Sequence, residues 1–404
     1  MNEGNGRRVL MLLQNCSYPR DDRVRREART LAVAGYRVSV IAPSSPGLAR
    51  REVLDGVRVY RFRAPKPASG FLGYVWEYAY SLAAVFMTSL AIRLREDFDV
   101  VHAHQPPDAF VFIAAFYKLL GKRFIMDHHD LAPELYYARF RGHGNRGVHR
   151  ALTWLERLSC RLADHVIATN GSYKRVEMER GGVPESRITI VRNGPDLEEL
   201  RPTEPDPALH GRASVIIGYV GVMGIQDGVE HLLGAIRHLA VDLKRTGFLC
   251  VLVGSGDALP ALRSVARRIG IDAQVVFTGW VDSQGDVARW LSGMDICVAP
   301  EPPDPYNERS TAAKVMEYMA LEKPVVAFDL PEHRFTAQDA AVFARPGDDL
   351  DLARQISALM DDPGRRREMG RRGRERIEKE LGWQCQAKAL LTVYETLFSP
   401  SGGC

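Results

Sequence analysis

The sequence predicts an α/β fold built from two doubly wound, Rossmann-like domains. Its 404 residues are enough for two domains of about 200 residues, each with its own core. Apolar runs of strand length alternate with helical stretches, and the alternation starts again after the proline-rich stretch 201–214, which is typical of an interdomain linker. We therefore expect domains at 1–200 and 211–384, with ligands bound in a cleft beyond the carboxyl ends of the strands.

Short apolar runs, many of them rich in valine and isoleucine, predict the strands. In the first domain they are Val9–Leu13, Arg37–Ala42, Val57–Phe62, Val100–Ala103, Arg123–Met126, His165–Ala168 and Ile188–Val191. In the second domain they are Val215–Val220, Phe248–Val253, Val275–Phe277, Ile296–Ala299, Val325–Phe328 and Ala341–Phe343. Helical stretches separate most of them, which favours largely parallel sheets.

The composition is that of an ordinary globular protein. The cysteines are scattered without a CxxC pair, which predicts free thiols in a reducing compartment and no zinc site. They are Cys16, Cys160, Cys250, Cys297, Cys385 and Cys404. The first apolar run, VLMLLQ, is short and fits a strand better than a signal sequence, so we expect the protein in the cytoplasm.

Charge is distributed unevenly along the chain. Residues 1–192 hold 30 Lys+Arg and 19 Asp+Glu, a balance of +11, whereas the remainder holds 24 and 31, a balance of −7. Basic surface is often merely solvated, but nucleic acid and anionic lipid are alternatives. The basic half contains no nucleic-acid-binding motif with interspersed aromatic residues, so lipid is the favoured partner. The clustered arginines are Arg139, Arg141, Arg146, Arg150, Arg157 and Arg161, with Glu156 the one acid among them.

The most apolar stretch, 71–92, allows three interpretations. Its length permits a transmembrane helix, although Glu77 interrupts it and its aromatic residues gather at one end. It also fits a buried helix of the first domain, or an interfacial helix flanked by Arg93 and Arg95. The third interpretation adds peripheral attachment to the inner face of the cell membrane.

The segment after the first strand predicts a helix that begins at Asp21 or Asp22 and ends at Gly35. Arg20 and Arg23 stand at its entrance. They either reach an anionic ligand or are simply solvated.

Two predicted strands end in histidine and aspartate, in DVVHAHQPP and RFIMDHHDL. Imidazole and carboxylate are zinc and iron ligands, so a metal cluster is one interpretation. Against it, adjacent His128 and His129 on a strand end point to opposite sides, so at most one of them faces a ligand easily. We predict no metal here; the residues of this interpretation are His102, His104, Asp127, His128, His129 and Asp130.

The stretch 307–329, NERSTAAKVMEYMALEKPVVAFD, predicts a loop, a helix, a tight break and a buried strand. Ser310 or Thr311 is the expected N-cap. Lys314 lies in the first turn, where the helix dipole disfavours a cation, and Glu317 follows one turn on. These two residues either form an i,i+3 ion pair on a solvated face, or they bind a ligand. In the second case Lys314 and the helix N–H groups share a phosphate, while Glu317 accepts hydrogen bonds from sugar hydroxyls.

Several phrases follow one another along nearly the whole chain: HAH, HHDLAPELY, NGPD, a glycine-rich turn and KVMEYMALEKPVVA. In this combination the sequence resembles glycosyltransferase family 4. The resemblance implies a GT-B fold, a nucleotide diphosphate sugar as donor, and transfer with retention of the anomeric configuration. It also implies that the leaving phosphate takes the acceptor proton, that no metal or other cofactor is required, and that the last helix, 385–398, packs back on the first domain.

The resemblance gives roles to particular residues. His129 matches the histidine that meets the donor sugar, with Asp130 and Glu134 as its supporting groups. Asn193 belongs to an Asn-Gly-x-Asp turn that borders the donor. Glu317 matches the second glutamate of a motif in which seven residues separate two glutamates.

The sequence departs from the family both where members hold the donor sugar and where they hold the diphosphate. The first glutamate of the motif falls on Arg309, with Glu308 beside it. Val222 and Asp227 stand where most members keep an arginine and a lysine. We therefore expect other groups to meet the diphosphate: the N–H groups of the turn with Gly221 and Gly224, the helix start near Thr311, and the side chains of Lys314, Arg23 and Arg309.

The phrase DHHDLAPELY resembles bacterial enzymes that build O-antigen, capsule or exopolysaccharide units on a polyprenyl diphosphate lipid. With the basic first half, this suggests a glycan acceptor carried at an anionic membrane. Two alternatives stay open. One is a sugar-nucleotide epimerase of the same fold, and the other is a non-enzymatic protein that binds nucleotide sugars without turnover.

Overall fold

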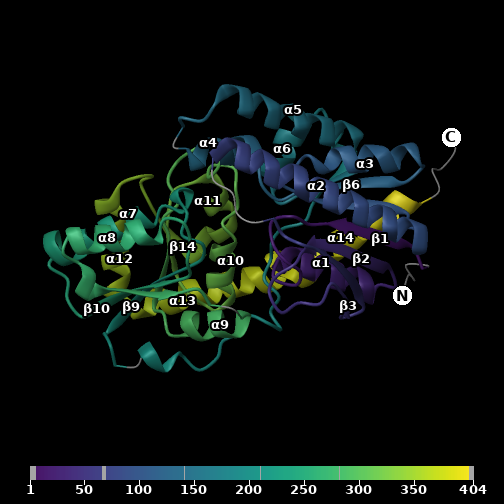
Figure 1. Cartoon of the computed structure of the whole chain (residues 1–404). Coiled ribbons are helices and arrows are strands. Elements are labelled where there is room, and N and C mark those ends of the chain that lie inside the picture. The colour runs from purple at the N-terminus through teal and green to yellow at the C-terminus, as the bar shows by residue number, and fades with distance from the viewer. Residues whose placement is uncertain (1–5, 66–69, 141, 210, 282, 400–404) are drawn as a thin grey trace. The chain divides into compact units, whose positions relative to one another are not determined.

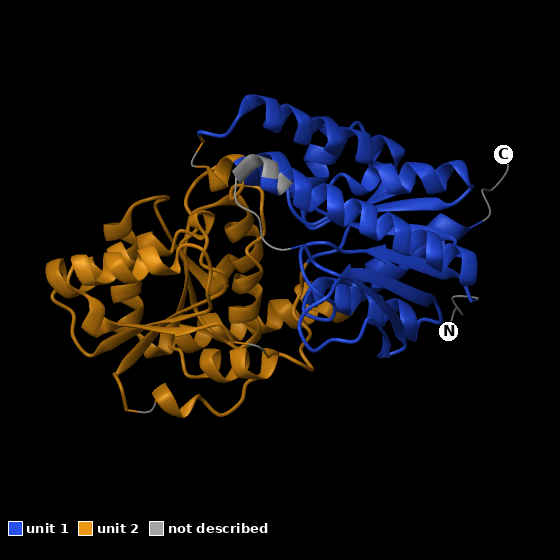
Figure 2. Cartoon of the chain, viewed as in Figure 1, with its two compact units in different colours: residues 1–136, 143–192, 386–404 blue, residues 137–142, 193–385 orange. Residues whose placement is uncertain are grey.

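The computed structural model describes residues 6–65, 70–140, 142–209, 211–281 and 283–399 (Figure 1). The chain divides into two compact units (Figure 2): unit 1 is Met1–Tyr136, His143–Arg192 and Gln386–Cys404, and unit 2 is Tyr137–Gly142 and Asn193–Cys385. The chain thus enters unit 2 before the expected linker 201–214. Leu200 and Leu209 explain the difference, because both are buried in a core of unit 2.

Unit 1 is built on an eight-stranded sheet in the order β3-β4-β2-β1-β5-β6-β7-β8. Neighbouring strands are parallel, except for the antiparallel pair β3 and β4. The strands are β1 Arg8–Leu12, β2 Arg37–Pro43, β3 Arg51–Leu54, β4 Val57–Phe62, β5 Val100–Gln105, β6 Arg123–His128, β7 His165–Ala168 and β8 Ile188–Ile190. The strand β3 was not predicted. It is joined to β4 by a tight turn in which Asp55 and Gly56 take φ angles of 49° and 80°.

Helices alternate with these strands. They are α1 Asp22–Val33, α2 Gly70–Arg95, α3 Phe110–Leu119, α4 Ala132–Arg139, α5 Arg146–Leu162 and α6 Gly171–Glu179, with a short turn η1 at Glu185–Arg187. Side-chain oxygens of Asp21, Asn145 and Asn170 accept N–H groups of the first turn and so start α1, α5 and α6. The start of α1 was predicted correctly.

The helix α2 packs on unit 1 through one face and contacts β2 and β4. The buried side chains of this face recur at helical spacing: Ser81, Val85, Ser89 and Ile92. Trp76 and Met87 are 64% and 63% exposed. Among the described residues, Val75–Arg95 is the one segment long and apolar enough to cross a membrane, and 22% of its most apolar window is buried. The stretch is therefore a surface helix with an apolar outer face rather than a fully buried one.

Unit 2 is built on a six-stranded parallel sheet in the order β11-β10-β9-β12-β13-β14. The strands are β9 Val215–Val220, β10 Phe248–Val253, β11 Val275–Gly279, β12 Ile296–Ala299, β13 Val325–Phe328 and β14 Ala341–Ala344. All six were predicted to within two residues at either end. The order reverses between β9 and β12, since β10 lies on one side of β9 and β12 on the other.

Helices cover both faces of this sheet. They are α7 Val229–Arg237, α8 Leu259–Arg268, α9 Gln284–Ser292, α10 Ala313–Ala320, α11 Pro331–Ala337, α12 Asp349–Met360 and α13 Pro363–Arg376, with short turns η2 Pro207–Leu209, η3 Ile225–Asp227, η4 His238–Asp242, η5 Asp272–Gln274, η6 Gln338–Ala340 and η7 Ile377–Leu381. Alternate residues of β9 enter different cores: Ile217 packs with α7 and α12, and Ile216 packs with α9 and α10. The unit is therefore doubly wound, as the sequence predicted.

The last helix, α14 Trp383–Phe398, belongs to unit 1 from Gln386 onwards. Tyr394 is fully buried there, and its hydroxyl lies 2.7 Å from Nδ1 of His102. The guanidinium of Arg7 lies 3.9 Å from the centre of the Phe398 ring. The two ends of the described chain are therefore parts of one unit.

Candidate functional site

The carboxyl ends of β9 and β12 bring together a turn and a loop of unit 2. The turn 221–228 follows β9, and the loop 300–312 follows β12 and leads into α10. Because the strand order reverses between these strands, both segments leave the sheet at a topological switch point, where open α/β sheets bind ligands. The predicted donor residues in these segments and at the start of α10 are Gly221, Gly224, Glu308, Arg309, Thr311 and Lys314.

Lys314 links the turn and the loop. Its Nζ lies 2.5 Å from Oε1 of Glu301, 3.1 Å from Oδ1 of Asp227 and 3.1 Å from the hydroxyl of Tyr219. These partners match the three donors of an ammonium group. The stem of the lysine passes Gly221, where an added Cβ would lie 3.1 Å from Cε of Lys314. The structure thus places Lys314 against the glycine-rich turn.

The charge of Lys314 is already matched inside unit 2. The side chains of Lys314, Asp227 and Glu301 are 11%, 17% and 6% exposed. Burial alone would raise the pKa of Glu301, but the charges of Lys314 and His333 outweigh it and lower that pKa to about 2. Glu301 is therefore an anion at neutral pH. The sequence did not predict these partners of Lys314, because it does not show that Glu301 and Asp227 converge on it.

The N–H groups of the glycine-rich turn are mostly used within unit 2. Gly221 donates to the carbonyl oxygen of Val253 at 3.0 Å, and Gly224 donates to Oδ2 of Asp227 at 3.0 Å. Both glycines were expected to offer these groups to a phosphate, so that expectation was wrong for this conformation. The N–H of Val222 has no hydrogen-bond partner among the described residues, and Val222 is 51% exposed. Val222 thus supplies a backbone donor of this turn that no described residue uses.

Helix α10 begins at Ala313, later than expected. Its N-cap residue is Ala312, not Ser310 or Thr311. The hydroxyl of Thr311 lies 3.2 Å from Oε2 of Glu332, on α11, and donates to that carboxylate. Thr311 therefore links the loop before α10 to α11 instead of capping α10.

The remaining predicted residues of this region differ in exposure. Glu317 is half-buried on α10, one turn after Lys314. Glu308 is exposed on the loop after β12, and Arg309 donates from Nη1 to a backbone carbonyl oxygen of the same loop at 2.7 Å. Glu317 is thus the carboxylate that shares a helix with Lys314.

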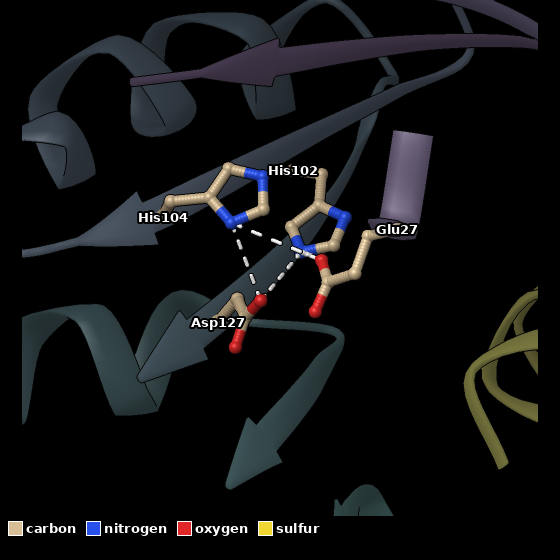
Figure 3. Close-up of side chains that lie close together, drawn as sticks. All are labelled: Glu27, His102, His104 and Asp127. Carbon is tan, nitrogen blue, oxygen red and sulfur yellow. Dashed lines mark hydrogen bonds and ion pairs between the residues drawn. The ribbon is translucent and has the colours of Figure 1, made fainter. Parts of the chain in front are cut away.

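In unit 1, a second group gathers at the carboxyl ends of β5 and β6 and the start of α1. Asp127 is fully buried at the end of β6, and Nη2 of Arg23 lies 2.8 Å from its Oδ1. Nε2 of His129 lies 3.0 Å from Oδ2 of Asp127 and 3.0 Å from Nε of Arg23. His102 and His104 on β5 point at the same carboxylate (Figure 3). Asp127 therefore holds this group together.

Arg23 and Glu134 do not take their predicted roles. The side chain of Arg23 is 5% exposed and serves Asp127, so it does not reach outward to an anionic ligand. Glu134 pairs with Arg180 at 2.6 Å instead of supporting His129. The support for His129 is Asp127, which the sequence offered as a metal ligand because it ends a strand.

The two other predicted residues lie outside helices and strands. Asp130 of unit 1 and Asn193, the first residue of the main segment of unit 2, are both half-buried. The turn after Asn193 requires Gly194, because a Cβ there would lie 1.9 Å from the carbonyl oxygen of Leu381. This position of the motif thus requires glycine because the backbone of Leu381 leaves no space for a side chain.

His128 lies in a different environment from His129. It is fully buried, with Nδ1 at 3.2 Å from Oε1 of Glu177 and Nε2 at 3.9 Å from Oε2 of Glu156. Burial alone would lower the pKa of His128, but these carboxylates outweigh it and raise the pKa to about 9. The prediction that the two adjacent histidines point to opposite sides is confirmed. His128 carries a buried positive charge at neutral pH.

The charge of His128 predicts how stability depends on pH. Its folded pKa of about 9 lies above the unfolded value of about 6.5, so its stabilising effect is complete below pH 6.5 and is lost as pH rises through about 9. The loss amounts to about 3 kcal/mol of unfolding free energy. Urea titrations from about pH 6 to about pH 10 should show this fall in the parent protein and a nearly level profile in His128→Asn.

His165→Asn is the matched control. His165 is buried in the same sheet, on β7, and burial lowers its pKa to about 4, so it stays neutral throughout this range. The control should keep the slope of the parent. An equally steep fall in His128→Asn would show that another group causes it.

Comparisons with known proteins agree with this architecture. Residues 23–199 match the family described as Glycosyltransferase Family 4, and residues 214–362 match Glycosyl transferases group 1. The 2-deoxystreptamine glucosyltransferase of Streptomyces kanamyceticus is 25% identical over 384 residues, which cover 92% of this chain and 97% of that enzyme. Sucrose-phosphate synthase of Thermosynechococcus elongatus has a TM-score of 0.78 at 19% identity, covering 97% of this chain and 99% of the other.

A second solved structure, Anabaena Alr3699/HepE in complex with UDP-glucose, has a TM-score of 0.71 at 16% identity, covering 96% of this chain and 99% of the other. The two family matches follow one another along the chain; the first covers most of unit 1 and the second lies within unit 2. The chain therefore belongs to the glycosyltransferases of the GT-B fold, with a family 4 domain followed by a group 1 domain.

Proposed function

We propose that this glycosyltransferase uses a nucleotide diphosphate sugar as donor and retains the anomeric configuration of the sugar. One observation carries the proposal. At the switch point of unit 2, a partly exposed lysine, a backbone N–H without a partner among the described residues and the helix that bears Glu317 meet at the ends of neighbouring strands. The Anabaena neighbour that was solved with UDP-glucose supports a nucleotide sugar as the ligand.

The diphosphate binds, in this proposal, by replacing one carboxylate of the Lys314 cluster. Lys314 and Asp227 are partly exposed, whereas Glu301 is nearly buried, so a phosphate oxygen can take the place of Asp227 while Glu301 keeps the lysine in position. The N–H of Val222 and the first turn of α10 add donors and the positive end of the helix dipole. These groups supply the stabilisation that other members obtain from an arginine and a lysine.

The sugar lies against Glu317 in this proposal, and the leaving diphosphate takes the acceptor proton. Glu317 is on the same helix as Lys314, so one element positions both the phosphate and the sugar hydroxyls. Positive charge develops on the anomeric carbon as the bond to the diphosphate breaks, and fixed anions and donors stabilise that charge separation. No step requires a metal ion. His129, held by Asp127, meets the donor sugar, with Asp130 beside it.

A donor screen with Glu317→Gln tests the proposed activity. Nucleotide sugars that raise the melting temperature are incubated with candidate acceptors, and the released nucleotide and the anomeric configuration of the product are measured by NMR. The variant removes a charge but little volume, so it should lower turnover about ten- to a hundredfold, the value of one charge-assisted hydrogen bond, without unfolding the protein. Glu322→Gln, an exposed glutamate just after α10, should behave as the parent.

Other outcomes of this screen identify other functions. An inverted product would exclude the retaining mechanism. Conversion of the donor into its epimer without any acceptor would show an epimerase. Binding of a donor with no turnover for any acceptor would show a nucleotide-sugar binding protein, an outcome that the neutralised Lys314 would explain.

Exchange of Asp227 for phosphate predicts opposite effects of two substitutions. Lys314→Met should weaken nucleoside diphosphate binding about ten- to a hundredfold, because one charge-assisted contact is lost. Asp227→Asn should strengthen it by up to about tenfold, because the competing anion is gone. Calorimetry with the diphosphate and with the bare nucleoside measures both effects, and nucleoside affinity should change little in either variant.

Asp361→Asn is the control for this pair, since Asp361 is an exposed aspartate of the same unit that pairs with Arg245. It should bind as the parent does. If Asp227→Asn binds no more tightly and Lys314→Met no more weakly than the parent, the diphosphate takes its cation from another residue, with Arg309 next in line.

We further propose that the acceptor is a lipid-linked glycan used in bacterial surface polysaccharide synthesis, reached from an anionic membrane through unit 1. On α5, a basic stripe recurs at helical spacing and surrounds an exposed tryptophan. Its members are Arg146, Arg150, Trp154, Arg157 and Arg161. Among the described residues, no carboxylate pairs with any of these four arginines. Arg139 ends α4, and Arg141 lies outside the described residues.

Exposed aromatic rings extend this surface over α3 towards α2. The rings of Phe112 and Trp154 lie 6.4 Å apart, and those of Phe86 and Phe116 lie 5.1 Å apart. Phe112 and Trp154 are 48% and 56% exposed. Basic stripes beside apolar surface are typical of elements that bind the membrane interface. The arginines of α13 differ, because several pair with glutamates of their own helix, such as Arg371 with Glu368 at 2.9 Å.

Vesicle binding tests the basic stripe. Each arginine near an anionic surface contributes about 1 kcal/mol, so Arg150→Ala with Arg157→Ala should weaken binding to anionic vesicles about thirtyfold. Binding should also fall at high salt and be absent with zwitterionic lipid. Arg365→Ala with Arg367→Ala removes two exposed arginines from α13 and should change nothing. Equal binding to both lipids, or equal losses in both double variants, would leave the stripe as a solvated surface.

A further inference from the structure

Four buried side chains of unit 1 direct ligand-type atoms at one point (Figure 3). His102 and His104 come from β5, Asp127 from β6 and Glu27 from α1. One atom of each lies within 4.8 Å of those of the others. The sequence suggested three of these residues as one interpretation of its histidine and aspartate pattern. It missed Glu27, which lies far away in the chain and reaches the cluster from the middle of a helix.

Among the four residues, the spacing of these atoms fits a shared cation better than direct hydrogen bonds; outside the four, Nδ1 of His104 also lies 3.2 Å from Nε2 of His129. Nε2 of His102 lies 3.4 Å from Oδ2 of Asp127 and 3.6 Å from Oε2 of Glu27. Nδ1 of His104 lies 3.3 Å and 3.9 Å from the same two oxygens. Hydrogen bonds between nitrogen and oxygen are usually about 2.7 to 3.2 Å long. Ligands that surround a metal tetrahedrally at about 2.0 to 2.1 Å are roughly 3.3 Å apart.

Two further observations point to a missing ligand. Oε2 of Glu27 is buried and faces the two imidazoles, but it accepts no hydrogen bond from the described residues, whereas Oε1 pairs with Arg23. Nδ1 of His102 lies 2.7 Å from the hydroxyl of Tyr394. When Nδ1–H donates to that oxygen, the lone pair of Nε2 faces the centre of the cluster. This is the arrangement that orients a histidine ligand.

The charges of the cluster also favour an additional cation, because its two carboxylates have one guanidinium as counter-charge. Arg23 stands on the outer side, with Nη2 at 2.8 Å from Oδ1 of Asp127 and Nε at 3.0 Å from Oε1 of Glu27. One guanidinium balances one of the two carboxylates, so neutral histidines would leave one negative charge buried. Such a charge is costly in the protein interior. An added proton would make the cluster neutral, and a divalent metal ion would give it a net charge of +1. The spacing of the four atoms favours the metal ion.

We propose that Glu27, His102, His104 and Asp127 bind one divalent metal ion of the zinc class as a structural site of unit 1. Two imidazole nitrogens and two carboxylate oxygens suit zinc and its neighbours, and a closed set of four protein ligands is typical of structural rather than catalytic sites. The ion would join β5, β6 and α1, and through Tyr394 it would also hold α14. The site adjoins His129, whose Nε2 lies 3.0 Å from Oδ2 of Asp127, whereas the proposed diphosphate contacts use residues of unit 2.

Metal titration of the full-length protein tests the site. Protein made without a histidine tag is stripped with a chelator, dialysed and titrated with zinc or cobalt(II). One equivalent should bind, and cobalt should show the visible absorption bands of a tetrahedral site. At a hundredfold excess over the dissociation constant, zinc should raise the melting temperature by about 5 to 10 °C.

Substitutions assign the ligands. Glu27→Gln and His104→Asn should abolish the single strong site, and Tyr394→Phe should weaken it about ten- to a hundredfold by releasing His102. The matched controls are His165→Asn, a buried histidine of the same sheet, and Tyr117→Phe, a buried tyrosine of unit 1 that bonds Ser89. Both controls should bind one equivalent with the affinity of the parent. Tyr394→Phe keeps the test decisive if a ligand variant fails to fold.

Absence of a saturable site for zinc and cobalt, with no shift in melting temperature, would overturn the proposal. In that case Glu27→Gln, which mimics a protonated glutamate, should be as stable as the parent, and a proton would be the occupant. Sugar transfer measured in chelator separates this proposal from the proposed function. Transfer that persists in EDTA at low temperature, while the melting temperature falls, fits both proposals together.

Discussion

Both groups of residues depend on one constraint: a charge buried at the end of a parallel strand needs its counter-charge inside the same unit. In unit 2, Glu301 follows β12 and pairs with Lys314; in unit 1, Asp127 ends β6 and pairs with Arg23. Each pair joins different elements, so it fixes where a turn or a helix stands beside the strand ends. Removing one partner from such a pair typically costs about 3 to 5 kcal/mol. Polar groups that have no partner among the described residues of the same unit, such as the N–H of Val222, can bind a ligand.

Local patterns predicted the strands because parallel strands covered on both faces appear as continuous apolar runs, as in Val215–Val220. The edge strand β3 was missed, since Arg51–Leu54 alternates exposed and partly buried residues and its signal was the following Asp-Gly turn. Helix α10 was found, but its start was misplaced. Thr311 has the chemistry of an N-cap, and a carboxylate 21 residues further along the chain competes for its hydroxyl.

The partners of charged residues could not be predicted in the same way. Lys314 and Asp227 are 87 residues apart, Arg23 and Asp127 are 104 apart, and Glu134 finds Arg180 at a separation of 46. Periodicity in the sequence indicates which residues are neighbours within one helix or strand. It does not indicate which of the 50 acidic residues pairs with a given lysine or arginine. The sequence could therefore assign candidate binding residues to segments at strand ends, while their partners and their burial followed from contacts between segments.

The assignment of α14 to unit 1 has a consequence for how the chain is made. Residues 386–404 complete unit 1, yet a ribosome adds them after all of residues 193–385. At about 5 to 20 residues per second, synthesis of that intervening segment takes roughly 10 to 40 s. Throughout that interval His102 lacks its contact with Tyr394, because the helix that provides it does not yet exist. The unit whose synthesis begins first is therefore the last to be completed, and a truncated translation product would expose its unfinished core.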